Sequence, residues 1–116
     1  REVIAAAQAN GVGVMGIRAV QAGALTDAID RDLPPDHGEV RDYNRAGAYR
    51  ALAAELGLSA APLGHRYALS MAGVDTVVLG VKNRAELAEC VAAAEAGPLP
   101  DDIMARVDGC FTGNTN

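Results

Sequence analysis

The chain has 116 residues, the size of one domain, and half of them are hydrophobic. One Phe and three Tyr are its only aromatic residues, so Ala, Val, Leu and Ile must build the core. The net charge of −5 argues against a nucleic-acid-binding surface, which would need a basic stripe. No apolar run approaches the roughly 18 residues of a membrane span, so we expect no membrane partner.

The first predicted elements are a helix and a strand. Apolar residues at helical spacing predict a helix over residues 1–10, and Asn10-Gly11 is a typical stop signal. No cap precedes this helix, so we expect the sequence to be a piece of a longer protein. Residues 12–17 follow as an apolar strand. They do not alternate with polar residues, which predicts burial on both faces, as in parallel sheets.

A long connection and two helices come next. Residues 18–42 are predicted to be a loop, and loops of this length are usually functional or mobile. A helix is predicted over residues 44–56, with apolar residues at helical spacing. Ser59 is a predicted cap for a further helix that ends near Ser70 and tolerates Pro62 in its first turn.

The last third of the chain predicts a second strand and two helices. The strand covers residues 76–79, and Asn83 begins a helix that Gly97-Pro98 ends. The buried stripe expected on this helix is Leu87, Cys90, Val91 and Ala94. Asp101 and Asp102 open a final helix, as the helix dipole favours. Its inward residues should be Ile103, Met104 and Val107, and residues 112–116 are expected to be a disordered tail.

The order of these elements predicts an α/β fold. The two strands are separated by a long segment with two helices, which excludes a hairpin and favours a parallel crossover. Two strands with four to five helices would leave a sheet edge open on each side. The pattern therefore fits the C-terminal part of a (β/α)8 TIM barrel better than a complete sheet.

The turn after the second strand has the residues expected of a phosphate site. Gly80 and Lys82 follow the strand, and a helix then starts at Asn83. Backbone N–H groups and positive charge at this place commonly bind phosphates in α/β proteins. The alternative is that Lys82 is a solvated loop residue, while Asn83 and Glu86 have the spacing of a capping box.

Three segments, residues 11–25, 52–59 and 76–90, resemble the aldo/keto reductase family. The resemblance covers most of the chain and implies that residues 1–111 are the C-terminal segment of the barrel, with NADP (or NAD) as cofactor. It implies that the turn after the first strand holds the cofactor pyrophosphate. The turn after the second strand would bind the ribose phosphate, and the helix that follows would cover the adenine. The implied cofactor-binding residues are Arg18, Val20, Gly23, Gly80, Lys82, Asn83, Glu86, Glu89 and Cys90.

Several of these residues depart from the family pattern. Arg18 and Val20 stand where the family has Ser and Leu, while Gly23 matches. Cys90 replaces a usual Asn beside the adenine. A carboxylate at Glu86 would repel a 2′-phosphate, which leaves the choice between NADP and NAD open.

The family's catalytic Asp, Tyr, Lys and His match no residue here, so the resemblance implies a segment without catalytic residues. The parent enzyme would reduce small aldehydes or ketones with the nicotinamide cofactor, and the isolated chain should be inactive. We expect no metal site, because His37 and His65 have no ligand-like spacing. Cys90 and Cys110 lack CxxC spacing, which favours free thiols and a cytoplasmic protein.

Two other interpretations remain. The chain could be a non-catalytic module that forms homo-oligomers by pairing its open sheet edges with another copy. The other is a doubly wound α/β domain with different chemistry, although the low strand count disfavours it. His65 is predicted to be a surface or packing residue, and Cys90 a core residue.

Overall fold

The computed structural model describes residues 2–17, 19, 25–26 and 32–111. The described part of the chain has six helices and two short strands in an α/β arrangement, against the four to five helices predicted. The predicted disordered tail, residues 112–116, lies outside the described residues.

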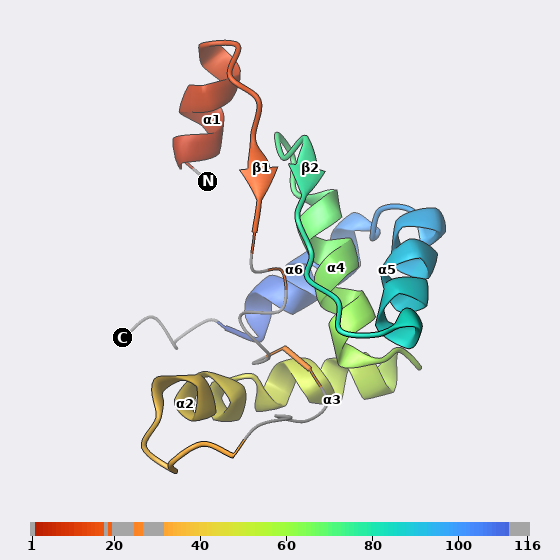
Figure 1. Ribbon diagram of the computed structural model, residues 1–116. Helices are drawn as coiled ribbons and strands as arrows, with labels where there is room; N and C mark the ends of the chain where they lie inside the picture. Colours follow the sequence, from red (N-terminus) through yellow and green to blue (C-terminus); the bar gives the residue numbers. More distant parts are fainter. Residues whose placement is uncertain (1, 18, 20–24, 27–31, 112–116) are drawn as a thin grey trace.

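The two strands pair in parallel, as predicted. β1 is Met15–Gly16 and β2 is Thr76–Val77, with Met15 opposite Thr76 and Gly16 opposite Val77. Both strands are shorter than expected. Asp75 lengthens the contact, because its carboxylate accepts a 2.7 Å hydrogen bond from the N–H of Val14 while its own N–H donates to the Val14 carbonyl at 2.9 Å. Figure 1 shows the two strands side by side, with α1 (Glu2–Ala9) beyond the start of β1.

The prediction that the first strand is buried on both faces is wrong for the described chain. Met15 is 64% exposed and Ile17 is 68% exposed. The second strand is likewise exposed, since Thr76 is exposed and Val78, just after the strand, is 50% exposed. Two strands provide neighbours for only part of their surface, so apolar side chains on the uncovered part remain in contact with solvent.

The segment before the first core helix differs from the prediction in two ways. A helix, α2 (Gly38–Arg45), occupies the end of the predicted loop. It starts there because the His37 imidazole accepts a hydrogen bond from the N–H of Glu39 and so caps the helix. The single helix predicted over residues 44–56 is divided at Ala46, whose φ of −85° and ψ of 11° separate α2 from α3 (Gly47–Glu55).

The core lies among α3, α4 (Ala60–Ser70) and α6 (Asp101–Gly109), with the segment before α6 contributing Leu99. The apolar stripe predicted on α3 is confirmed, since Tyr49, Leu52 and Ala53 are buried. The inward residues predicted for α6 are confirmed as well. The buried cluster comprises Ala46, Tyr49, Leu52, Ala53, Ala60, Leu63, Leu99 and Val107.

Two polar contacts of α4 hold the turn between α5 (Arg84–Ala96) and α6. The Arg66 guanidinium donates to the carbonyl of Gly97 at 3.1 Å, and the Ser70 hydroxyl accepts from the N–H of Leu99 at 2.8 Å. Gly97 has a φ of 82°, a left-handed conformation that ends α5 as predicted. These contacts place α5 alongside α4, as Figure 1 shows.

The buried stripe predicted for α5 is wrong. Leu87 is 52% exposed, Val91 is similarly exposed and Ala94 is exposed, whereas Ala93 is the buried residue of this helix. The less exposed residues of α5 and its cap are Glu86, Cys90, Ala93 and Gly97, which recur at intervals of three and four. Small side chains at the last two positions let α5 approach α4 closely, and this contact outweighs the hydrophobicity of Leu87 and Val91.

Candidate functional site

The turn between β2 and α5 has the local geometry that its sequence predicts. Asn83 is the N-cap of α5, and its Oδ1 accepts a 2.9 Å hydrogen bond from the N–H of Glu86. Side chains that accept from this position satisfy one of the open N–H groups of a helix. The bond is the Asn83 half of the predicted capping box, so the primary role of this side chain is to begin the helix.

Gly80 lies in open space at the end of β2. A Cβ atom built on it would meet no other atom within 4 Å, and its φ is not positive. Neither backbone conformation nor packing among the described residues therefore requires a glycine at this position. The absence of a side chain leaves the end of the strand accessible to a ligand.

Two cations lie beside the cap. Lys82 precedes Asn83, and Arg84 is the first residue of α5; both side chains are exposed. The first N–H groups of a helix have no partner within it and carry the positive end of its dipole. Arg84 adds to this positive region and was not among the sequence-predicted site residues, although its place beside Lys82 was visible.

The predicted adenine-side residues do not share one environment. Glu89 is exposed, whereas Glu86 and Cys90 are half-buried on the side of α5 that approaches α4. Cys90 Sγ lies 3.6 Å from the Nε2 of His65 on α4. The structure thus brings together a thiol and an imidazole that lie 25 residues apart in the chain. No sequence pattern predicted this pair.

The ionisation of this pair is shifted toward the neutral forms. Burial lowers the pKa of His65, and the nearby Glu89 carboxylate only partly opposes this shift. The pKa of the Cys90 thiol is raised, first by burial and then by the charges of Glu89 and Glu86. Both effects follow from the cost of charging a group away from water or beside a like charge.

Three predicted site residues, Arg18, Val20 and Gly23, lie outside the described residues. The structure therefore places the six predicted residues of the second turn and helix, all on one continuous segment. His37, which the sequence left without a role, caps α2. Within the described ranges no group of three His, Cys, Asp or Glu side chains is arranged to hold a metal ion.

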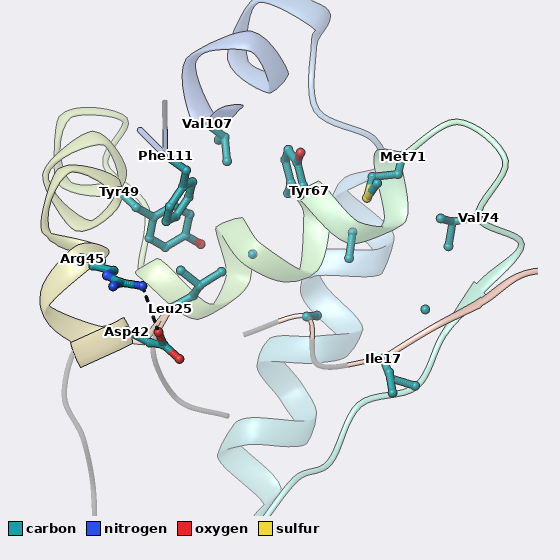
Figure 2. Close-up of a pocket in the computed structure, with 14 residues that line it drawn as sticks. Ile17, Leu25, Asp42, Arg45, Tyr49, Tyr67, Met71, Val74, Val107 and Phe111 are labelled. Atoms are coloured by element: carbon teal, nitrogen blue, oxygen red, sulfur yellow. Dashed lines mark ion pairs between the residues drawn. The ribbon is translucent and has the colours of Figure 1, made fainter. Parts of the chain in front are cut away.

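A separate cavity of about 440 Å³ lies beyond the carboxyl end of β1. Figure 2 shows it between the chain after β1 and helix α4, with Tyr49 and Phe111 at one end and Met71 and Val74 at the other. The described residues that line it are mostly apolar, and none of the six predicted cofactor-binding residues that the structure describes is among them.

The polar groups around this cavity are already engaged. Arg45 and Asp42 form an ion pair with a separation of 3.9 Å, drawn as a dashed line in Figure 2. The hydroxyl of Tyr49 donates to the carbonyl of Ala60, and that of Tyr67 donates to Asp108. Neither tyrosine therefore presents a proton to the cavity, in agreement with their predicted packing role.

None of the helices in the described ranges has the length and apolarity needed to cross a membrane.

Comparison with known proteins gives one family. The model of the aldo/keto reductase family matches residues 1–111 of the 116. No curated protein matches the chain. The family match spans the whole described structure and includes both predicted cofactor segments. The chain therefore belongs to the aldo/keto reductase family.

Proposed function

We propose that this chain forms the cofactor-phosphate and adenosine end of an NAD(P)H-dependent oxidoreductase that reduces aldehydes or ketones. Aldo/keto reductases are generally oxidoreductases that use NAD(P)H. The observation that carries the proposal is the turn after β2, where an open glycine, two cations and the start of α5 occur within five residues, from Gly80 to Arg84.

These groups suit a phosphate ester. The N–H groups of Arg84 and Ala85 are the first of the helix, and the dipole of α5 favours an anion in front of them. Lys82 and Arg84 add two positive charges to this end. The space at Gly80 allows a ligand to approach the backbone. The residues present therefore fit the phosphate half of a nicotinamide cofactor.

The role of this chain would be to bind and orient the cofactor, which supplies the hydride for a carbonyl carbon when bound. Asn83 would keep the start of α5 rigid, because its side chain already holds the N–H of Glu86. Glu86 is half-buried, so it opposes a 2′-phosphate less than a fully exposed carboxylate in the turn would. Both NADP and NAD remain candidates, and we expect the chain alone not to reduce a carbonyl compound.

Ligand titration of the full chain tests the proposal. The probes are 2′,5′-ADP and 5′-AMP, followed by isothermal calorimetry and by the backbone amide resonances of Arg84 and Ala85. We expect saturable binding that shifts these resonances, with 2′,5′-ADP stronger if the enzyme prefers NADP. Replacing both Lys82 and Arg84 by Ala should weaken binding about fivefold, because exposed charges contribute on the order of 0.5 kcal/mol each.

One control variant and one further test variant make the titration specific. Arg41→Ala removes an exposed cation on α2, away from the turn, and should leave affinity unchanged. Gly80→Ala should weaken binding without loss of stability, because the added Cβ meets no protein atom within 4 Å. A phosphate site at this turn would be contradicted if Arg41→Ala weakened binding as much as the double replacement of Lys82 and Arg84. It would also be contradicted if the amide resonances of Arg84 and Ala85 did not shift.

A second candidate function is a self-associating module. It is favoured by the apolar side chains that Met15, Ile17 and Val78 expose around the two strands. Among the described residues each strand pairs with one other strand, which leaves one of its edges open to a further strand there. Analytical ultracentrifugation of the full chain distinguishes the candidates. A concentration-independent monomer that melts cooperatively would contradict self-association.

A further inference from the structure

The two cysteines of this chain are closely matched except for one neighbour. Cys90 and Cys110 are both half-buried and free, and burial raises the pKa of both thiols. The thiol of Cys110 donates to the carbonyl of Arg106 within its own helix turn. The thiol of Cys90 instead faces the imidazole of His65, with 3.6 Å between Sγ and Nε2. Only Cys90 therefore has a group that can accept its proton.

His65 is held in a fixed and dry position. Only 7% of the residue is exposed, and its Nδ1 is buried without a hydrogen-bond partner in the described structure. A neutral imidazole donates with one nitrogen and accepts with the other. When Nδ1 carries the proton, Nε2 is the acceptor and points at the Cys90 thiol.

Burial disfavours both charged forms of the pair, so the proton leaves sulfur only as Sγ forms a new bond. The lowered pKa of His65 keeps the ring neutral at pH 7, so the acceptor site is available. Glu89 stabilises the imidazolium that would form, while Glu89 and Glu86 together disfavour the isolated thiolate. On α4, the neighbouring Arg66 is directed to the carbonyls of Gly97 and Pro98. The geometry therefore allows direct transfer of the proton from Sγ to Nε2 during an attack, while free thiolate is disfavoured.

We propose that Cys90 is a modification site for low-molecular-weight disulfides, with His65 as its proton acceptor. The Cys90 Sγ–H proton moves to Nε2 of His65 as Sγ attacks one sulfur of the disulfide. A new S–S bond forms, the original S–S bond breaks, and the departing thiolate takes the proton from Nε2. The disulfide is reduced to one free thiol, and Cys90 is oxidised to a mixed disulfide. The carboxylates of Glu86 and Glu89 favour a disulfide that carries positive charge. Cys90 is also one of the predicted adenine-side residues, but the reaction itself does not need the cofactor.

The test follows mixed-disulfide formation by the full chain with cystamine, a cationic disulfide, from pH 5.5 to 9.5. Intact-mass spectrometry of Cys110→Ser reports Cys90 alone, and Cys90→Ser reports Cys110 alone. We expect the Cys90 rate to rise at low pH, to stay level from about pH 6.5 to 9, where the imidazole is neutral and the thiol is protonated, and to rise again above that. The Cys110 rate should increase about tenfold per pH unit, since it depends on free thiolate.

The variant His65→Gln should remove the level region and slow Cys90 at pH 7 about a hundredfold or more, the usual scale of general-base assistance. Loosening of the α4–α5 contact would expose Cys90 and accelerate its reaction, so damage to the fold cannot imitate this result. The pH profile of Cys110→Ser decides the question without any change to His65. A Cys90 rate that climbs tenfold per pH unit like that of Cys110, with no level region, would overturn the proposal.

Discussion

The helical cluster (α3, α4 and α6) and the strand pair (β1 and β2) use similar apolar residues with opposite results. Leu63 in the cluster is completely buried, whereas Met15 and Ile17 at the strand pair are mostly exposed. The helices surround one another, so each apolar stripe finds a partner. Within the described ranges the strands pair with each other, and β2 also packs against α4. Burial therefore depends on how many neighbours an element has, and hydrophobicity alone does not provide them.

The largest expected difference between these two regions is in the cost of removing an apolar side chain. Leu63→Ala should lower the free energy of unfolding by about 2–5 kcal/mol, because it leaves a cavity in packed surroundings. Met15→Ala should change it by about 0.5 kcal/mol or less, as for most surface substitutions. Urea unfolding followed by circular dichroism measures both. Similar losses would show that β1 is covered in solution by something other than this chain.

A second comparison concerns two glycines with positive φ. Gly73, between α4 and β2, has a φ of 87°, and a Cβ there would lie 2.4 Å from Cγ2 of Ile4 on α1. Gly57 has a φ of 70° but open space around it. Gly57→Ala should cost about 1 kcal/mol from backbone strain, and Gly73→Ala more, because it also separates α1 from the turn.

Hydrogen exchange of the α1 amides distinguishes the two causes. Gly73→Ala should increase exchange in α1, and Gly57→Ala should not. If both variants leave α1 equally protected, the contact between Ile4 and the turn does not hold this helix.

A smaller effect is expected for the helix caps at the two regions. Asn83→Ala at the end of the strand pair should cost about 1 kcal/mol, because its side chain accepts from the N–H of Glu86. Ser59 is the N-cap of α4 in the cluster, but its side chain makes no capping bond. Ser59→Ala should therefore cost less. Thermal melts of both variants provide the measurement, and the reverse order would contradict the capping geometry.

The smallest predicted effect is a pH dependence at the edge of the helical cluster. Burial lowers the pKa of His65 in the folded protein below its ordinary value of 6.5, so folding favours the neutral ring. Its contribution to stability is complete above that value and is lost as the pH falls through the lower, folded pKa. His65→Gln should therefore lose less stability than the wild type between pH 7.5 and pH 5.5. Denaturant unfolding at both pH values tests this, and equal losses would refute it.

The candidate site was predictable where it depends on neighbouring residues. The sequence indicated that Asn83 begins α5 and that Lys82 lies in the turn before it, since capping is a contact over three residues. It placed Cys90 on the covered side of α5 but did not indicate Glu86 or Ala93, because the covered side depends on how α5 rotates against a helix far away in the chain. The predicted stripe followed the larger side chains, and the actual contact follows Ala93 and Gly97.

The sequence by itself determined the helix boundaries at Asn83, Gly97 and Asp101, and the parallel pairing of β1 with β2. Those features rest on local hydrogen bonds, backbone conformation and the length of the connection. Only the tertiary structure decided which side of α5 is covered, that the strand pair remains largely exposed, and that His65 meets Cys90. These features depend on packing between segments distant in the chain, where shape and available neighbours outweigh the hydrophobicity of single residues.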